Sequence, residues 1–277
     1  MTDQKTTAVP DTIPTAVPDT IPTAVTTVDK SEDLPPVQPL ILWVSGGKGG
    51  VGKTTAARVL SDLLSDQTDA IYGYDCDPIN PQFQRFYGAE YLPLIDADRK
   101  TADTAVETLA ERIEAKKHQF IIIDSPAGEV DILGQLESRF AFVSGLKDIG
   151  AKLTRIFVMS TTPESVNLLQ RSLDNSEGLP IGHIAVRNLH FGAQRYFDTY
   201  NNSNAKTLLE ARCGRTIDFP QLGQIATDSI DQKSLTYFAA TQKDCGLPTM
   251  RRSMIYQWRK NVRHEFSKAG RLLGLKP

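Results

Sequence analysis

The chain has 277 residues, of which 40% are hydrophobic and 23% are charged, and its formal net charge is −2. This composition supports a folded core of ordinary size and excludes a disulfide-rich mini-protein and a wholly disordered chain. A net charge near zero also excludes a polycation that coats nucleic acid by bulk charge, so any anion binding must be local.

The cysteines and the hydropathy pattern bear on the compartment. Cys76, Cys213 and Cys245 are widely spaced and form no C-x-x-C pair, which favours a reducing compartment over a disulfide framework or a zinc site. No apolar run approaches the ~18 residues of a membrane span, and the N-terminus lacks the pattern of a secretion signal. We therefore expect a cytoplasmic protein.

Residues 1–38 differ in composition from the rest of the chain. The sequence TAVPDTIP occupies positions 7–14 and again 15–22, and a third copy begins at Thr23. Two prolines in every eight residues prevent a regular helix or sheet ladder, and the segment has few large apolar side chains. We predict a disordered tail that serves as a spacer or as an extended arm for a partner.

Short apolar runs begin at about residue 39 and alternate with longer segments of helical periodicity. The helical pattern is clearest at 102–116, where Val106, Leu109, Ala110 and Ile113 share one face. Further helical patterns lie at 54–65, 163–173 and 226–240. Six apolar runs predict buried strands, at 40–45, 71–75, 120–124, 155–160, 183–188 and 215–219.

This alternation predicts an α/β fold, with a single domain over 39–250 built on a mostly parallel sheet that helices cover on both faces. Ligands of such folds bind at the carboxyl ends of the strands. The functional residues are therefore expected directly after Ser45, Asp75, Asp124 and Asn188.

A glycine-rich loop follows the first predicted strand. Residues 46–55 read GGKGGVGKTT and fit the pattern G-x-x-x-x-G-K-[ST]. Glycines allow successive backbone N–H groups to point at phosphate oxygens, and the helix that follows adds its positive end. The motif predicts a P-loop site for ATP in which Lys53 neutralises the β and γ phosphates. The expected contacts are Gly47, Lys48, Gly49, Gly50, Val51, Gly52, Lys53, Thr54 and Thr55.

The run FIIIDSPAG at 120–128 places an acidic residue at the end of a buried strand. We expect the Thr54 hydroxyl to bind Mg²⁺ and Asp124 to hold the ion through a water, because Mg²⁺ prefers hard oxygen ligands and keeps several waters. Gly128 then lets the backbone approach the γ phosphate, so that this loop senses whether that phosphate is present.

Three motifs carry a resemblance to a known family. GKGGVGKTT, with Lys48 after the first motif glycine, resembles the deviant Walker A motif of the ParA/MinD family of dimerising ATPases, while YDCDP at 74–78 and DSPAG at 124–128 resemble its switch I and switch II. The resemblance implies that Lys48 reaches across a nucleotide-sandwiched homodimer to the partner's phosphates. It also implies that Asp77 positions the attacking water and that Asp75 lies nearer the metal, although the two roles could be exchanged.

The same resemblance implies slow ATP hydrolysis and places two later residues against the adenine. Asn188 follows one late predicted strand and Pro220 follows another, where the family contacts the edge and the face of the base. From the residues alone, Asn188 could equally cap a turn.

Residues 251–277 are strongly basic. They hold eight Lys and Arg residues against the single acidic residue Glu265, so the segment carries +7 and the rest of the chain −9. A helix here gathers its large apolar side chains into one stripe, namely Met254, Trp258, Val262, Phe266, Ala269 and Leu273. The candidate DNA-binding residues lie on the other side: Arg251, Arg252, Arg259, Lys260, Arg263, Lys268 and Arg271.

Three interpretations of this C-terminal helix are open. In the first, the stripe packs on the domain and the basic face is only solvated. In the second, the basic face binds DNA phosphates without sequence preference, as ParA-type ATPases do. In the third, the stripe enters a membrane surface with Trp258 and Phe266 as anchors. Gly270 and Gly274 weaken the last turns as a membrane anchor, which favours DNA.

We therefore expect a Mg²⁺-dependent, ParA-like ATPase. ATP drives a homodimer that binds nonspecific DNA on the nucleoid, a ParB-like or other adaptor stimulates hydrolysis, and hydrolysis resets the dimer. The expected task is partition or positioning of a plasmid or other large cargo. The alternatives are an accessory ATPase of conjugation or plasmid stability, and a MinD-like membrane-associated positioning ATPase.

Overall fold

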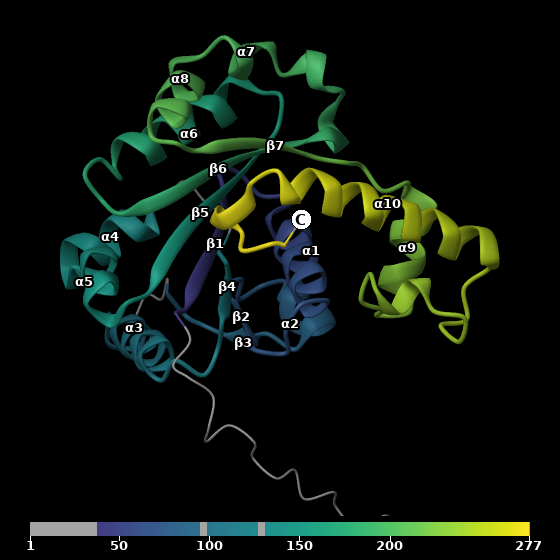
Figure 1. Ribbon diagram of the computed structural model, residues 1–277, viewed down its shortest axis with the longest axis horizontal. Coiled ribbons are helices and arrows are strands. Elements are labelled where there is room, and N and C mark those ends of the chain that lie inside the picture. Colours follow the sequence, from purple (N-terminus) through teal and green to yellow (C-terminus); the bar gives the residue numbers. More distant parts are fainter. Residues whose placement is uncertain (1–37, 95–98, 127–130, 277) are drawn as a thin grey trace, which may run out of the picture. The chain divides into compact units, whose positions relative to one another are not determined.

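The computed structural model describes residues 38–94, 99–126 and 131–276. These residues form one seven-stranded sheet in the order β3-β2-β4-β1-β5-β6-β7, in which every pair of neighbours is parallel (Figure 1). Residues 1–37 of the predicted tail and the predicted phosphate sensor Gly128 lie outside the described residues. The α/β architecture predicted from the alternating pattern is confirmed.

All six predicted apolar runs form strands. The strands are β1 (Leu40–Gly46), β2 (Ile71–Asp75), β3 (Glu90–Tyr91), β4 (Phe120–Asp124), β5 (Lys152–Met159), β6 (Ile181–Asn188) and β7 (Arg215–Phe219). The sequence pattern missed β3, because two exposed residues at the edge of the sheet carry no apolar run.

Helices cover both faces of the sheet, so alternate residues of β1 enter different cores. Leu42 and Val44 pack in one core with α1 (Lys53–Ser65), α9 (Gln224–Gln232) and α10 (Thr249–Ser267). Ile41 and Trp43 pack in the other with α3 (Arg99–Glu114), α4 (Ile132–Phe140) and α5 (Phe142–Ile149). A third core lies under α6 (Pro163–Asp174), α7 (Asp198–Asn201) and α8 (Asn204–Ala211).

The helix predicted over 226–240 is wrong in its second half. The helix α9 ends at Gln232, and Ser234 has a positive φ of 50°, which an α-helix does not accommodate. The chain then continues through a short 3-10 turn, η4 (Ala239–Thr241). The short helix α2 (Gln82–Tyr87) was also not predicted.

The C-terminal apolar stripe packs on the domain. Trp258, Val262 and Phe266 of α10 are buried in the same core as β7, and the chain ends after a 3-10 turn, η5 (Gly270–Leu272). The prediction that Met254 belongs to this stripe is wrong: its side chain is 53% exposed and Ile255 is buried instead. Among the described residues, no helix is both long enough and apolar enough to cross a membrane.

Candidate functional site

The carboxyl ends of the central strands bring the predicted site together. Asp75 of β2 lies opposite Asp124 of β4, and Asp124 lies opposite Val44 of β1 in the parallel register. The phosphate loop, residues 46–55, leaves β1 at this edge and enters α1 at Lys53. The strand order β2-β4-β1 in the sheet makes these three motifs neighbours.

Two glycines of the phosphate loop have a left-handed backbone conformation. Gly50 and Gly52 have φ values of 76° and 98°, a region that L side chains rarely adopt. A Cβ atom on Gly52 would also lie 2.6 Å from Nδ2 of Asn188. The loop backbone can therefore turn its N–H groups inward, as an anion cradle demands.

Lys53 is buried at the base of this loop. Its ammonium donates to the Lys48 carbonyl oxygen at 3.1 Å, and burial lowers its pKa while Asp124 and Asp77 act to raise it. A buried ammonium held by a single neutral carbonyl gains from an anionic partner. A cavity of about 240 Å³ opens beside it, lined by Gly49, Gly50, Gly52, Lys53, Thr54, Thr55, Asp77, Asn80, Gln82 and Ser125.

Asp124 is the least satisfied carboxylate of the site. It is 1% exposed, and neither of its oxygens accepts a well-formed hydrogen bond from a described residue. Burial and the nearby Asp75 carboxylate raise its pKa to about 7, against the opposing effects of the Thr54 side chain and Lys53. An orphaned buried carboxylate beside a threonine hydroxyl fits the oxygen ligands that Mg²⁺ prefers.

The two switch I carboxylates have different surroundings. Asp75 is fully buried, and its two oxygens accept the backbone N–H groups of Asp77 and Gln84 at 3.0 and 3.1 Å. Asp77 lines the cavity, and one of its oxygens accepts the N–H groups of Ile79 and Asn80. Asp75 therefore shapes the turn, while Asp77 keeps an oxygen available toward the phosphate loop.

Lys48 has a partner that the sequence did not suggest. Its side chain is 51% exposed and forms an ion pair with Glu164, which lies in the first turn of α6. Thr162 caps this helix and Pro163 begins it, so the end of β5 delivers Glu164 to the phosphate loop. An acidic residue just after a central strand is the signal that could have identified it.

Asn188 and Pro220 line a second cavity, of about 220 Å³. Gly50, Gly52 and Thr55 line both this cavity and the first one. The Asn188 amide donates to the Val51 carbonyl at 2.8 Å, and its oxygen accepts the His190 N–H at 3.0 Å. Both predicted functions of this residue, capping a turn and lining the nucleotide site, are thus compatible.

Among the residues of the second cavity that sequence reasoning did not assign to the site are Arg58, Tyr237 and Trp258. The Arg58 guanidinium is buried, lies 3.7 Å from the Phe86 ring centroid and makes only long contacts of 3.4 Å with Asp231. Nothing in the sequence distinguishes Arg58 from the other residues of α1, so only the packing of α1 against distant segments shows that it lines the cavity.

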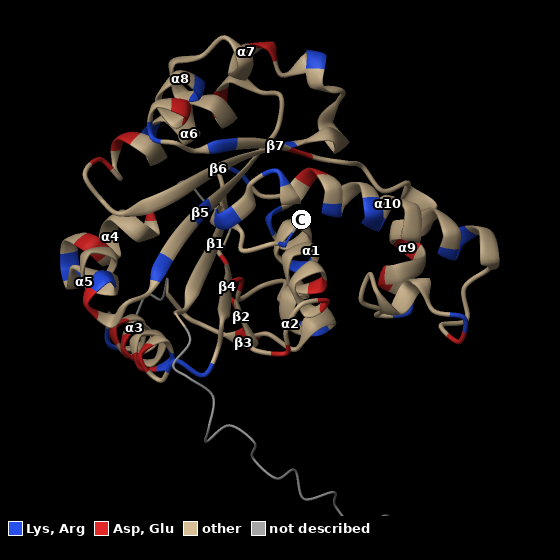
Figure 2. Ribbon diagram, viewed as in Figure 1, with Lys and Arg blue, Asp and Glu red and all other residues tan. Residues whose placement is uncertain are grey.

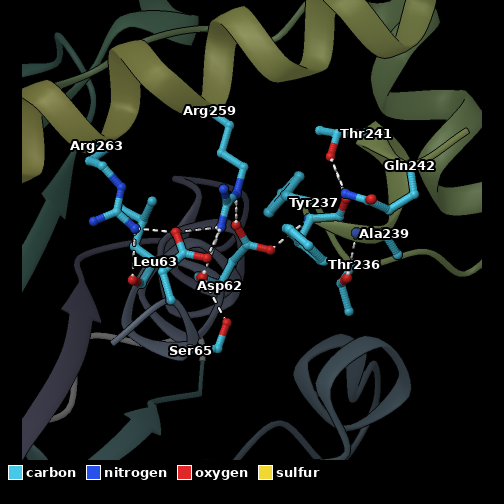
Figure 3. Close-up of polar contacts among 12 residues, drawn as sticks. Asp62, Leu63, Ser65, Thr236, Tyr237, Ala239, Thr241, Gln242, Arg259 and Arg263 are labelled. Carbon is cyan, nitrogen blue, oxygen red and sulfur yellow. Dashed lines mark hydrogen bonds and ion pairs between the residues drawn. The ribbon is translucent and has the colours of Figure 1, made fainter. Parts of the chain in front are cut away.

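The predicted DNA-binding residues of α10 fall into two groups. Arg259 and Arg263 reach α1 and pair with the carboxylates of Asp62 and Asp66 (Figure 3). Arg251 donates to Ser229 at 2.8 Å, and Arg252 donates to two backbone carbonyls, of Lys243 and Leu247.

The second group remains on the exposed side of α10 and the turn after it, where Figure 2 shows several basic positions. Lys260 and Arg271 are exposed and form no hydrogen bond or ion pair with the residues that the structure describes. Lys268 pairs with Glu265 on the same helix. Four of the seven candidate cations therefore serve internal contacts, and three stay at the surface.

The family of this chain follows from comparison with known proteins. The family model described as the CobQ/CobB/MinD/ParA nucleotide binding domain matches residues 42–199, which is more than half of the chain. The protein MobD of Acidithiobacillus ferrooxidans is 26% identical over 227 residues, which cover 80% of this chain and 94% of that protein.

Solved structures with the same fold include a putative plasmid partition protein from Borrelia burgdorferi B31 bound to AMPPNP. It is 18% identical, with a TM-score of 0.50, and the match covers 83% of this chain and 99% of that chain. The septum site-determining protein MinD of Pyrococcus horikoshii OT3, complexed with Mg-ADP, is 17% identical, with a TM-score of 0.47 and coverage of 85% and 99%. The phosphate loop, the parallel sheet and the matching family model lead to one conclusion: the chain belongs to the CobQ/CobB/MinD/ParA family of nucleotide-binding proteins.

Proposed function

We propose that this protein is a Mg²⁺-dependent, ParA-like ATPase whose ATP-bound homodimer binds DNA without sequence preference and partitions or positions a plasmid or other large cargo. Family membership and the likeness to a plasmid partition protein solved with AMPPNP support the choice. The observation that carries it is the buried Asp124 beside Lys53 and Thr54, neither of whose oxygens accepts a well-formed hydrogen bond from a described residue.

The residues of the site divide the work of hydrolysis. The backbone N–H groups of the phosphate loop cradle the phosphates, and Lys53 exchanges its bond to the Lys48 carbonyl for phosphate oxygens. Thr54 and Asp124 hold Mg²⁺, which when bound neutralises charge on the β and γ phosphates. Asp77, which lines the same cavity, orients the attacking water.

Lys48 acts across the dimer in this proposal. Its ion pair with Glu164 is half exposed, so little free energy opposes its exchange for a phosphate of the partner's nucleotide. We expect Lys48→Ala to abolish ATP-dependent dimers in sedimentation experiments while some ATP affinity remains. Dimers that persist in this variant would exclude a role for Lys48 in trans.

Asp77 and Asp75 can be separated by turnover. We expect Asp77→Ala to bind ATP and to stay on DNA as a trapped dimer, because the water is no longer oriented. Turnover at the normal rate in Asp77→Ala would assign the catalytic role to another carboxylate. Ile79→Ala, which changes an exposed neighbouring side chain outside the lining of the cavity, is the matched control.

The DNA surface in this proposal is the exposed side of α10. Lys260, His264 and Lys268 recur every four residues, and Arg271 follows in η5, so they form one solvent-facing stripe. Phosphate contacts from such a stripe release counterions and carry no base specificity. Trp258 and Phe266 are 6% and 0% exposed, so insertion of the apolar stripe into a membrane would first require α10 to leave the core.

The deciding experiment is binding of nonspecific duplex DNA to the full chain with ATP, ADP or no nucleotide, over a range of salt concentrations. The proposal expects tight binding with ATP only, weakening steeply with salt. Absence of DNA binding in all three states, with ATP binding intact, would overturn the DNA step. Anionic vesicles in the same assay test the membrane alternative directly.

A further inference from the structure

The second cavity is partly built by the C-terminal helix. One end of the cavity is continuous with the phosphate loop through Gly50, Gly52 and Thr55. The other end is lined by three aromatic residues, Phe219, Tyr237 and Trp258, of which Trp258 belongs to α10. The cavity has both polar and apolar lining, and its aromatic side chains beside a phosphate cradle suit the flat face of a nucleotide base.

Trp258 connects this hollow to the loop that follows β7. Its indole N–H donates to the Pro220 carbonyl oxygen at 2.8 Å. Its ring centroid lies 4.8 Å from that of Tyr237 and 6.2 Å from that of Phe219. A single side chain thus fixes both the backbone at Pro220 and the aromatic packing around the cavity.

The residue after Trp258 fixes the helix from the other side. Arg259 binds the Asp62 carboxylate and donates to both oxygens of Asp66 at 2.8 Å (Figure 3). Asp62 also accepts the Phe238 N–H at 2.7 Å, next to Tyr237. The helix α1 begins in the phosphate loop and carries Asp62 in its last turn, so α10 is attached both to the loop after β7 and to α1.

We infer that Trp258 is a positioning residue for the nucleotide base: through its hydrogen bond to Pro220 and its contact with Tyr237, α10 shapes the base end of the site. The inference rests on the proposed nucleotide binding at the phosphate loop. It extends that function by assigning part of the base site to the helix that also carries Lys260 and Lys268.

The test is Trp258→Phe in the full chain, which keeps an aromatic ring and removes the N–H donor. ATP and inorganic tripolyphosphate, which has no base, are titrated in parallel by calorimetry. We expect the affinity for ATP to fall by about five- to tenfold, the effect of one lost hydrogen bond, and the affinity for tripolyphosphate to stay unchanged. Tyr256→Phe, an exposed position on the same helix, is the matched control.

A second measurement does not depend on that variant's folding. In Trp43→Phe, Trp258 is the sole tryptophan, and its fluorescence should change with ATP but not with tripolyphosphate. The inference would be overturned if Trp258→Phe lost affinity equally for ATP and tripolyphosphate, or kept its full ATP affinity. It would also be overturned if the Trp258 fluorescence did not change on addition of ATP. Failure of the unaltered protein to bind either ligand would instead remove the proposed nucleotide binding itself, and the inference with it.

Discussion

The Lys53 ammonium lies 3.1 Å from a carbonyl oxygen of its own phosphate loop, whereas Arg259 and Arg263 of α10 form ion pairs with carboxylates at the end of α1. The sequence identified the phosphate loop by its glycine-rich motif and the C-terminal helix by its clustered positive charge. In the phosphate loop, the one hydrogen bond of the buried Lys53 ammonium to a described residue goes to a neutral carbonyl oxygen. In α10, the arginines at the α1 side already have anionic partners, whereas Lys260 on the exposed side has none among the residues that the structure describes.

The difference shows that the number of basic residues in a segment does not measure the charge that it offers to a ligand. An arginine keeps its charge and offers several N–H donors, and Arg259 and Arg263 both donate to the carboxylate of Asp66. The lysines at 260 and 268 sit at solvent-facing positions. Four variants test this division, from the largest expected effect to the smallest.

The first variant removes the cation of the phosphate loop. Lys53→Ala should weaken ATP and tripolyphosphate binding on the order of a hundredfold or more, because it deletes the charge-assisted contact to phosphate. Calorimetry measures both affinities. Since burial lowers the pKa of Lys53, the nucleotide-free variant should unfold at no lower temperature than the unaltered protein. Retained affinity would contradict the assignment, and Lys243→Ala, at an exposed site, is the control.

The second variant breaks an internal cation contact of α10. Arg259→Met leaves the Asp62 carboxylate, which is 2% exposed, with the Phe238 N–H and a long contact to the Tyr87 hydroxyl. We expect a loss of about 3 kcal/mol in the free energy of unfolding, measured with urea, because a buried charge loses its partner. Lys260→Met should change it by less than about 0.5 kcal/mol. Equal effects of the two variants would remove the distinction between the two groups.

The third variant tests whether the buried His183 is held in its neutral form. Burial, with Arg155 and Arg212 nearby, lowers the pKa of His183 to about 3. The unfolded chain protonates this histidine near pH 6.5, so its contribution to stability is complete above pH 6.5 and is lost as pH falls from 6.5 toward 3.

By pH 5 that loss amounts to about 2 kcal/mol. Glutamine cannot titrate. Between pH 7 and pH 5, the free energy of unfolding of His183→Gln should therefore fall by about 2 kcal/mol less than that of the unaltered protein. Gln257→Ala, at an exposed position of α10 without an ionisable group, should keep the slope of the unaltered protein. Parallel pH profiles for all three proteins would show that His183 is not held neutral.

The fourth variant has the smallest effect and concerns the exposed cations. Lys260→Gln should reduce the salt dependence of DNA binding by about 0.9 in the slope of log K against log salt, because one phosphate contact is lost. Arg252→Gln, whose guanidinium binds backbone carbonyls, should leave the slope unchanged. An unchanged slope for Lys260→Gln would move the DNA surface away from this stripe.

Much of the fold was predictable because its signals are local. Each buried parallel strand is a short apolar run, and the phosphate loop is a contiguous motif between a strand and a helix. The predictions failed where no local signal exists, as at β3, or where a positive φ ended a helical pattern, as at Ser234. Met254 and Ile255 are adjacent and both apolar, so only the docking angle of α10 decided which is buried.

By itself, the sequence determined the phosphate loop, the carboxylate at the end of β4 and the resemblance to the ParA/MinD family, because these depend on residue types at fixed spacings along the chain. The tertiary structure alone decided that Glu164 pairs with Lys48, that Asp75 shapes a turn while Asp77 faces the cavity, and that Trp258 reaches the Pro220 carbonyl. These contacts join residues that only packing brings together, so no periodicity along the chain records them.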